Sequence, residues 1–247
     1  MNKEKTIVFK RLRKICAVIL SLTCAFTLIS CAEKDDEPIV EPEYYTEGLV
    51  FNEADDLKTC QVSGYVGTDE EVVIPNEYRF TPVDAIRESA FEGNDRIVSV
   101  KIPDNVLEIG EFAFYGCSSL KIIDVGNGVE TIGDSAFKNC NSATLIKIGD
   151  GVTTIEEDAF GSCSAVTRII LGKNVVKIGD FAFDRCSSLT AVFYFGDEQS
   201  KEKISYETYF NTPLDKASWY YYSETRPQEN AGAYWYYDEE KSPVLWA

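Results

Sequence analysis

Residues 106–128 read VLEIGEFAFYGCSSLKIIDVGNG, and the same pattern occurs in four further segments at a spacing of 23 residues. These copies span residues 83–105, 129–151, 152–174 and 175–197, with no insertion between them. Each unit opens with valine, has isoleucine three residues later and places an Ala-Phe pair just beyond. A fixed period of this length is typical of proteins built from stacked structural repeats.

Near the end of each unit two apolar positions alternate with polar or variable ones, as Ile123 and Val125 do. A period of two predicts a short strand. The Ala-Phe segment is long enough for only one or two helical turns. A single unit cannot bury its apolar residues, whereas stacked units form a continuous core. The predicted fold is a leucine-rich-repeat solenoid with one short parallel strand per 23-residue coil.

The flanking segments differ from the repeats and predict atypical caps at residues 48–82 and 198–247. Residues 72–75 match the strand end at 100–103, so the opening unit should add a strand. The closing segment is rich in aromatic residues, which we interpret as a cover for the open end of the solenoid. The alternative is a sugar-binding platform. The aromatic residues concerned are Tyr209, Phe210, Trp219, Tyr220, Tyr221, Tyr222, Tyr234, Trp235, Tyr236, Tyr237 and Trp246.

The pattern I-G-x-x-A-F-x-x-C-S-S-L, at Ile109–Leu120 and Ile178–Leu189, resembles the BspA-type leucine-rich repeat. The segments Gly48–Pro75, Ala217–Glu224 and Val244–Trp246 are similar to that family's opening and closing units, so the resemblance covers residues 48–247. It implies a surface protein, in some members an adhesin for host extracellular proteins such as fibronectin or fibrinogen. Fold transfers better than ligand in such a diverse family.

The N-terminus predicts a lipoprotein signal peptide over residues 1–30. Residues 3–14 are basic, and the apolar run Ile15–Ile29 is too short for a comfortable membrane span. It ends in Leu28-Ile29-Ser30-Cys31, which is similar to a lipobox and predicts acylation of Cys31. The alternative is an ordinary signal peptide with a chance cysteine.

Residues 31–47 are acidic and contain prolines, which predicts a disordered tether. The run Lys34-Asp35-Asp36 resembles acidic signals that export lipoproteins to the surface of some Gram-negative bacteria. The alternative is a solvated linker without an export role. The expected location is the outer membrane, lipid-anchored and exposed at the cell surface.

Composition limits the possible chemistry. The chain has no histidine, which excludes Ser-His-Asp and Cys-His catalysis. A carboxylate-pair hydrolase remains conceivable, but no cleft with two differently placed carboxyls is evident, so we expect neither an enzyme nor a cofactor. The net charge is −17, and without residues 1–30 the chain has 18 basic and 40 acidic residues. Such an acidic surface disfavours nucleic acid as a partner.

Two repeat columns could suggest metal sites. One column contains four cysteines 23 residues apart with no C-x-x-C pair, so we expect buried free thiols rather than a metal or disulfide ladder. The other contains acids, which could attract calcium but which we interpret as lying at the start of each short helix. The columns are Cys117, Cys140, Cys163 and Cys186, and Glu88, Glu111, Asp134, Glu157 and Asp180.

The outward-facing strand positions are the candidate binding site. If Ile123 and Val125 point inward, their neighbours form two exposed columns that are poor in acid for so acidic a protein. An apolar strip edged by Lys and Arg is typical of a contact surface. The alternative is a second buried layer beneath the C-terminal segment. The predicted ligand-binding residues are Ile122, Leu145, Lys147, Arg168, Ile170 and Phe193.

These observations predict a surface lipoprotein that binds extracellular protein ligands, including host matrix proteins, through the sheet face. Its other contact would be the lipid membrane, through acylated Cys31. The main alternative is a carbohydrate-binding surface lipoprotein that supports glycan capture. A structural or assembly role without a soluble ligand is a third possibility.

Overall fold

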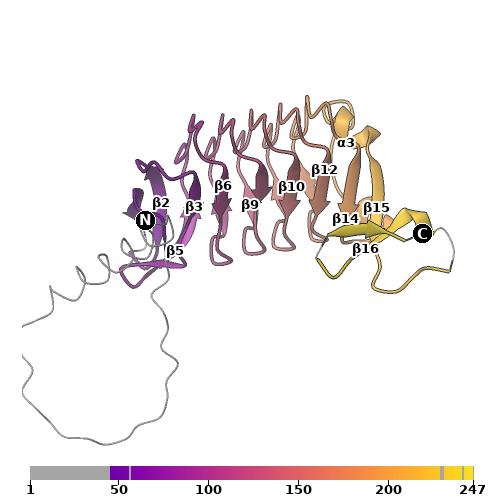
Figure 1. Cartoon of the computed structure of the whole chain (residues 1–247), viewed down its shortest axis with the longest axis horizontal. Helices are drawn as coiled ribbons and strands as arrows, with labels where there is room; N and C mark the ends of the chain where they lie inside the picture. The colour runs from indigo at the N-terminus through magenta and orange to yellow at the C-terminus, as the bar shows by residue number, and fades with distance from the viewer. Residues whose placement is uncertain (1–44, 56, 229–230, 241, 247) are drawn as a thin grey trace, which may run out of the picture. The chain divides into compact units, whose positions relative to one another are not determined.

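The computed structural model describes residues 45–55, 57–228, 231–240 and 242–246 (Figure 1). The predicted signal peptide, Cys31 and nearly all of the predicted tether lie outside these residues. Pro42–Ala247 form one compact unit, to which the description below refers.

The unit is a solenoid in which successive coils contribute strands to two long sheets, while β3 (Glu71–Val73) and β6 (Ser99–Lys101) form a third, two-stranded sheet (Figure 1). Sheet 1 consists of β1 (Leu49–Glu53), β2 (Cys60–Tyr65), β5 (Thr81–Ile86), β7 (Glu108–Ile109), β9 (Thr131–Ile132), β11 (Thr154–Ile155) and β13 (Lys177–Ile178), in that order, with β4 (Glu77–Tyr78) paired to β5. Sheet 2 consists of β8 (Ile122–Asp124), β10 (Leu145–Ile148), β12 (Arg168–Leu171), β14 (Ala191–Tyr194), β15 (Ser218–Tyr222), β16 (Tyr234–Tyr237) and β17 (Pro243–Leu245). The coil strands pair in parallel.

The predicted parallel solenoid with 23-residue coils is confirmed, and each repeat coil also contributes a strand to sheet 1, which has only two residues in the last four repeats. This strand includes the isoleucine of the Val-x-x-Ile motif, as Ile109 pairs with Ile132 in the next coil. A two-residue strand is too short to display an alternating pattern, so periodicity could not reveal it.

The repeated apolar residues form the core. Val, Ile, Ala, Phe and Cys of successive coils lie in columns that are almost fully buried. The phenylalanine rings stack nearly parallel, with centroids 4.7 Å apart between Phe91 and Phe114 and 5.4 Å apart between Phe137 and Phe160. These distances are close to the spacing of paired strands, so one ring per coil fills the interior without a gap.

The Ala-Phe segments are successive turns rather than the expected short helices. The residue after each acid of the acidic column has a left-handed backbone, with φ of 54° at Phe112 and 53° at Ser135, which a right-handed helix does not allow. The Phe112 amide donates to the Asp134 carbonyl of the next coil at 3.0 Å. The interpretation of these acids as helix-terminal residues is therefore wrong, because the turn amides are used between coils.

The cysteine column is buried, and its thiols are free, as predicted. Each thiol donates to the carbonyl of the phenylalanine in the preceding coil, at 3.2 Å from Cys117 to Phe91. Burial raises the pKa of Cys117 to about 12, so this thiol stays protonated at neutral pH.

The N-terminal end begins with a strand that resembles a repeat strand. As predicted, β3 (Glu71–Val73) pairs in parallel with β6 (Ser99–Lys101), with Val72 opposite Val100. Thr46 covers the free edge of β3, since its amide donates to the Val73 carbonyl at 3.1 Å and its hydroxyl accepts the Val73 amide at 2.8 Å. The backbone groups of this edge strand are thereby satisfied.

At the C-terminal end of the repeats, one side chain supplies the hydrogen-bond acceptor that the next coil supplies elsewhere. Within the repeats, each phenylalanine amide donates to an alanine carbonyl of the next coil, as Phe160 does to Ala182 at 2.8 Å. After the last repeat, Phe183 donates instead to Oδ1 of the buried Asn211 at 3.0 Å. The Asn211 amide group donates in turn to the Gly179 carbonyl at 3.0 Å. Two short helices, α2 (Glu198–Lys201) and α3 (Thr212–Lys216), lie in this region.

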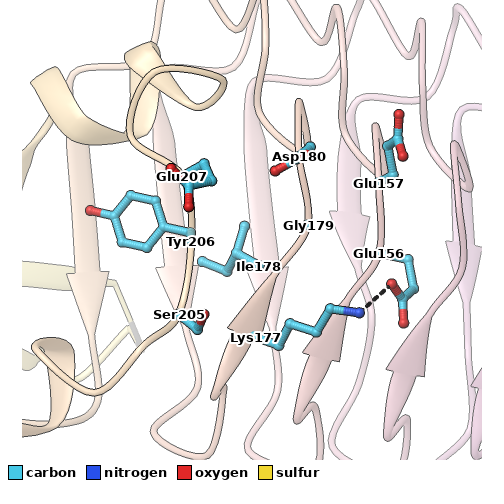
Figure 2. A pocket seen from close by; sticks show the side chains of 9 residues that line it. All are labelled: Glu156, Glu157, Lys177, Ile178, Gly179, Asp180, Ser205, Tyr206 and Glu207. Carbon is cyan, nitrogen blue, oxygen red and sulfur yellow. Dashed lines mark hydrogen bonds and ion pairs between the residues drawn. The ribbon is translucent and has the colours of Figure 1, made fainter.

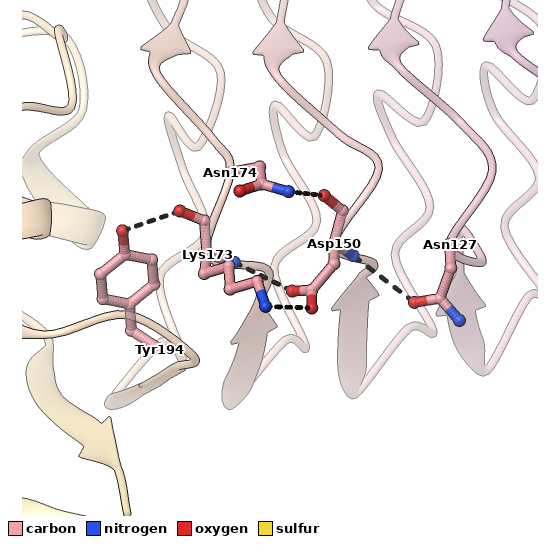
Figure 3. A network of polar contacts seen from close by, with 5 residues as sticks. All are labelled: Asn127, Asp150, Lys173, Asn174 and Tyr194. Carbon is pink, nitrogen blue, oxygen red and sulfur yellow. Dashed lines mark hydrogen bonds and ion pairs between the residues drawn. The ribbon is translucent and has the colours of Figure 1, made fainter.

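The loops that follow the strands of sheet 2 are joined by a polar network (Figure 3). Asp150 accepts the Lys173 amide at 3.1 Å and its own amide donates to the Asn127 side chain at 3.4 Å. The network ends at Tyr194, whose hydroxyl donates to the Lys173 carbonyl at 3.3 Å. The backbones of neighbouring coils approach closely here. A Cβ on Gly149 would lie 1.9 Å from the Gly126 carbonyl oxygen, so only glycine fits at this position.

Candidate ligand-binding face

The outer face of sheet 2 contains the predicted binding residues in the expected register. Arg168 lies between Leu145 of β10 and Ala191 of β14, and Ile170 lies beside Phe193. Ile122 extends the first column to β8 through its pairing with Leu145. The sequence therefore placed these side chains correctly relative to one another, but their exposure divides them into two groups.

The first group, which we call the open face, lies on β8, β10 and the start of β12. Ile122 is 44% exposed, Arg168 is exposed, and Leu145 and Lys147 are half-buried. Lys147 is 3.3 Å from Asp124, whose side chain is half exposed. Because Arg168 makes no ion pair with a described residue, its charge remains available to a ligand.

The second group is covered, so the expectation that Ile170 and Phe193 face solvent is wrong. They are only 4% and 6% exposed and form a separate cluster with the fully buried Trp235. The Trp235 ring is 5.6 Å from that of Phe193, and its Nε1 donates to the Tyr194 carbonyl at 3.1 Å. The alternative of a second buried layer beneath the C-terminal segment therefore holds for this half of the face.

The chain connection explains the cover. β16 is in register with β15 at only two positions, Tyr221 opposite Tyr234 and Tyr222 opposite Trp235. In Figure 1, β16 lies across the end of β14 and β15. Its side chains Trp235 and Tyr237 pack on Phe195, at ring distances of 4.9 Å and 5.9 Å. Sequence analysis placed Trp235 and Tyr237 among the aromatic residues of the C-terminal cover but did not assign them to the face of sheet 2, although the sequence Tyr-Trp-Tyr-Tyr could have suggested a strand with an apolar face.

Tyr237 marks the boundary between the covered part and the open face. The pKa of its hydroxyl is raised, chiefly by burial and then by the negative charges of Asp124, Tyr222 and Asp150. A phenol that remains protonated can donate a hydrogen bond at neutral pH.

A different groove lies beside sheet 1 and has a volume of about 310 Å³. It is formed by the ends of β11 and β13 and by the segment after α2, which includes Tyr206 (Figure 2). Lys177 forms an ion pair with Glu156 at 2.8 Å, and Glu157, Asp180 and Glu207 also line the groove. Among the described residues no group of three or more Cys, Asp or Glu is placed to hold a metal ion, so this acidity indicates a solvated surface.

The comparisons with known proteins agree with this geometry. The family model of the BspA-type leucine-rich repeat region matches residues 84–215 in six copies. The chain belongs to this family. The matched span continues beyond the five regular repeats into the segment that sequence analysis assigned to the C-terminal cap. Members of the family are typically surface-associated and non-enzymatic.

Two of the similar solved structures, those of TpLRR and PcpA, show the same fold. The leucine-rich repeat protein TpLRR of T. pallidum is 30% identical with a TM-score of 0.59, over 62% of this chain and 71% of that one. The pneumococcal vaccine antigen PcpA is 18% identical with a TM-score of 0.52, over 66% of this chain and 39% of that one. A leucine-rich repeat protein from Bacteroides ovatus is 27% identical with a TM-score of 0.47, over 62% and 47% of the two chains.

No curated protein matches the sequence. Within the described residues, no helix has the length and apolar character needed to cross a membrane.

Proposed function

We propose that this protein is a cell-surface lipoprotein that binds an extracellular protein ligand through the open face of sheet 2. The observation that carries the proposal is the exposed Ile122 beside the half-buried Leu145, next to Arg168, which is exposed and makes no ion pair with a described residue. Desolvation of apolar surface on contact favours binding, and arginine is enriched among the residues that dominate interfaces.

The charge of the open face supports an acidic partner segment. Arg168 is exposed and Lys147 is half-buried, while Asp124 is the one acid in the same columns of the open face and is paired with Lys147. In a chain with a net charge of −17, most of the surface would repel such a segment. Complementary charge speeds association and selects among partners. Host matrix proteins with acidic, partly apolar segments belong to this class.

The test begins with surface plasmon resonance of the full chain against a panel of extracellular matrix proteins, alongside a neutral glycan array. The double substitution Ile122→Ser with Arg168→Glu should weaken binding to any matrix protein identified at least tenfold, about 1.4 kcal/mol. The matched control is Val176→Ser with Lys177→Glu, an exposed pair on sheet 1, which should leave the affinity unchanged. Unchanged affinity in a folded open-face variant would place the protein-binding site elsewhere.

Anchoring is a separate part of the proposal and rests on Leu28-Ile29-Ser30-Cys31. Substitution of Cys31 by serine should abolish labelling with a palmitate analogue and release the protein from the membrane fraction. Labelling and membrane association that persist in the variant would contradict the lipoprotein assignment. Protease accessibility on intact cells then tests exposure at the outer surface.

A further inference from the structure

A second groove lies at the edge of sheet 2, away from the residues of the open face. It has a volume of about 570 Å³ and is formed by α2, β15 and the 3-10 turn η1 (Ala231–Ala233) with the start of β16. Its lining includes Glu198, Ser218, Trp219, Tyr221, Gly232 and Tyr234.

The groove exists because β16 pairs with only the last part of β15. The Ser218 amide donates to Thr190 beside β14, whereas the Ser223 amide donates to Trp235 of β16. Amides alternate in direction along a strand, so the peptide groups of Trp219 and Tyr221 point toward the β16 side. Pairing on that side starts at Tyr221, and the Trp219 backbone therefore faces the groove without a paired strand.

The walls combine aromatic rings with hydroxyl groups that have no partner among the described residues. The rings of Tyr221 and Tyr234 are 6.2 Å apart and inclined at 59°. Burial, followed by the negative charge of Glu198, raises the pKa of Tyr221, so its hydroxyl is a neutral donor. The Trp219 ring is held in place, because its Nε1 donates to the Leu214 carbonyl at 3.3 Å and Lys201 Nζ lies 4.6 Å from its centroid.

We propose that this groove is a binding site for a neutral oligosaccharide, independent of the protein-binding function assigned to the open face. Apolar ring surface with a few fixed polar groups is the usual composition of a small-ligand site. Tyrosine presents an apolar ring and a polar tip, which suits a sugar with C–H faces and hydroxyl edges. Glu198 supplies an acceptor for sugar hydroxyls and Trp219 a backbone donor.

Other occupants fit less well. An anionic ligand would meet the carboxylate of Glu198, and the nearby Glu202 also acts on Tyr221. On the side of β15 that faces β16, only Ser218–Tyr220 lack a paired strand. A peptide added there as a strand would pair over a segment shorter than the strands that usually form such pairings.

The experiment is a glycan array of neutral, sialylated and sulfated oligosaccharides probed with the full chain, followed by isothermal titration calorimetry of the strongest neutral ligand. Tyr221→Ala and Tyr234→Ala should each raise its Kd at least tenfold. Tyr221→Phe and Tyr234→Phe retain the ring and remove one hydrogen bond, so a smaller increase of roughly three- to tenfold is expected. The phenylalanine variants also keep the test valid if an alanine variant fails to fold.

Two controls separate this site from other surfaces. Tyr209→Ala removes a tyrosine that is 83% exposed and lies outside the groove, and it should leave the Kd unchanged. The open-face variant Ile122→Ser with Arg168→Glu should do the same. The proposal is overturned if no neutral glycan binds, if the anionic glycans bind preferentially, or if Tyr221 and Tyr234 variants retain full affinity.

Discussion

Ile122 and Ile123 are adjacent residues of β8, yet one is 44% exposed and the other 1% exposed. The Ile123 position is apolar in every repeat, and its equivalents stack along the interior. The Ile122 position instead contains Ser99, Leu145, Arg168 and Ala191 in the other coils. The inner face of these strands is therefore constrained by the repeat, whereas the residues of the outer face are free to vary. Only the outer-face residues can carry information about a ligand.

The outer face differs again between its two halves. Near the C-terminus, Trp235 covers Ile170 and Phe193 to form a small second core. Toward the N-terminus, Ile122 remains 44% exposed. A terminal segment can therefore convert part of a potential binding surface into buried structure, and the extent of that cover sets the size of the binding face.

The largest effect should come from the inner columns. Phe137→Ala removes the central ring of the stack, which is 2% exposed, and should lower the free energy of unfolding by roughly 3–5 kcal/mol. Chemical denaturation followed by circular dichroism measures the change. Phe80, which is 94% exposed, provides the matched control, and Phe80→Ala should change stability by less than about 0.5 kcal/mol. Similar values for the two variants would show that the ring stack does not form the core.

The covered half of the outer face should come next. Trp235→Ala removes a fully buried ring and its hydrogen bond to Tyr194, so a loss of about 3 kcal/mol is expected. It should also expose Phe193, detectable as increased binding of a hydrophobic dye. Trp235→Phe keeps an apolar ring and should recover part of the stability. If Trp235→Ala melts like the unmodified protein, the C-terminal segment does not hold the second core together.

A smaller loss is expected at the end of the solenoid. Asn211→Ala leaves the Phe183 amide without its acceptor, and an unsatisfied buried donor costs about 1–3 kcal/mol. Asn141 is exposed, and Asn141→Ala is the control that should have almost no effect. Hydrogen exchange should show faster exchange of the Phe183 amide in the Asn211 variant. Equal protection of that amide in both variants would mean that Asn211 does not substitute for the next coil.

The sequence predicted those parts of the molecule that depend on the 23-residue repeat. The 23-residue spacing gave the stack of coils, the inward columns and the register that brings Arg168 beside Leu145. It gave the cover by the C-terminal segment only as an alternative and did not assign it to Trp235, because the contact of Trp235 with Tyr194 joins residues 41 apart that share no repeat position. It also mistook turns for helices, since left-handed residues such as Phe112 depend on hydrogen bonds to the next coil.

The smallest effect is expected on the open face, where the comparison of Ile122 with Ile123 can be tested directly. Ile123→Ala creates a cavity in the core and should cost roughly 2–5 kcal/mol. Ile122 is 44% exposed, so Ile122→Ala removes a side chain that is only partly buried, and its effect on unfolding should be clearly smaller, about 1 kcal/mol or less. Both variants replace isoleucine by alanine in the same strand, so the change in strand propensity and the number of atoms removed are the same in the two variants. Equal losses would show that Ile122 is as buried as Ile123, and the open face would then not be available to a ligand.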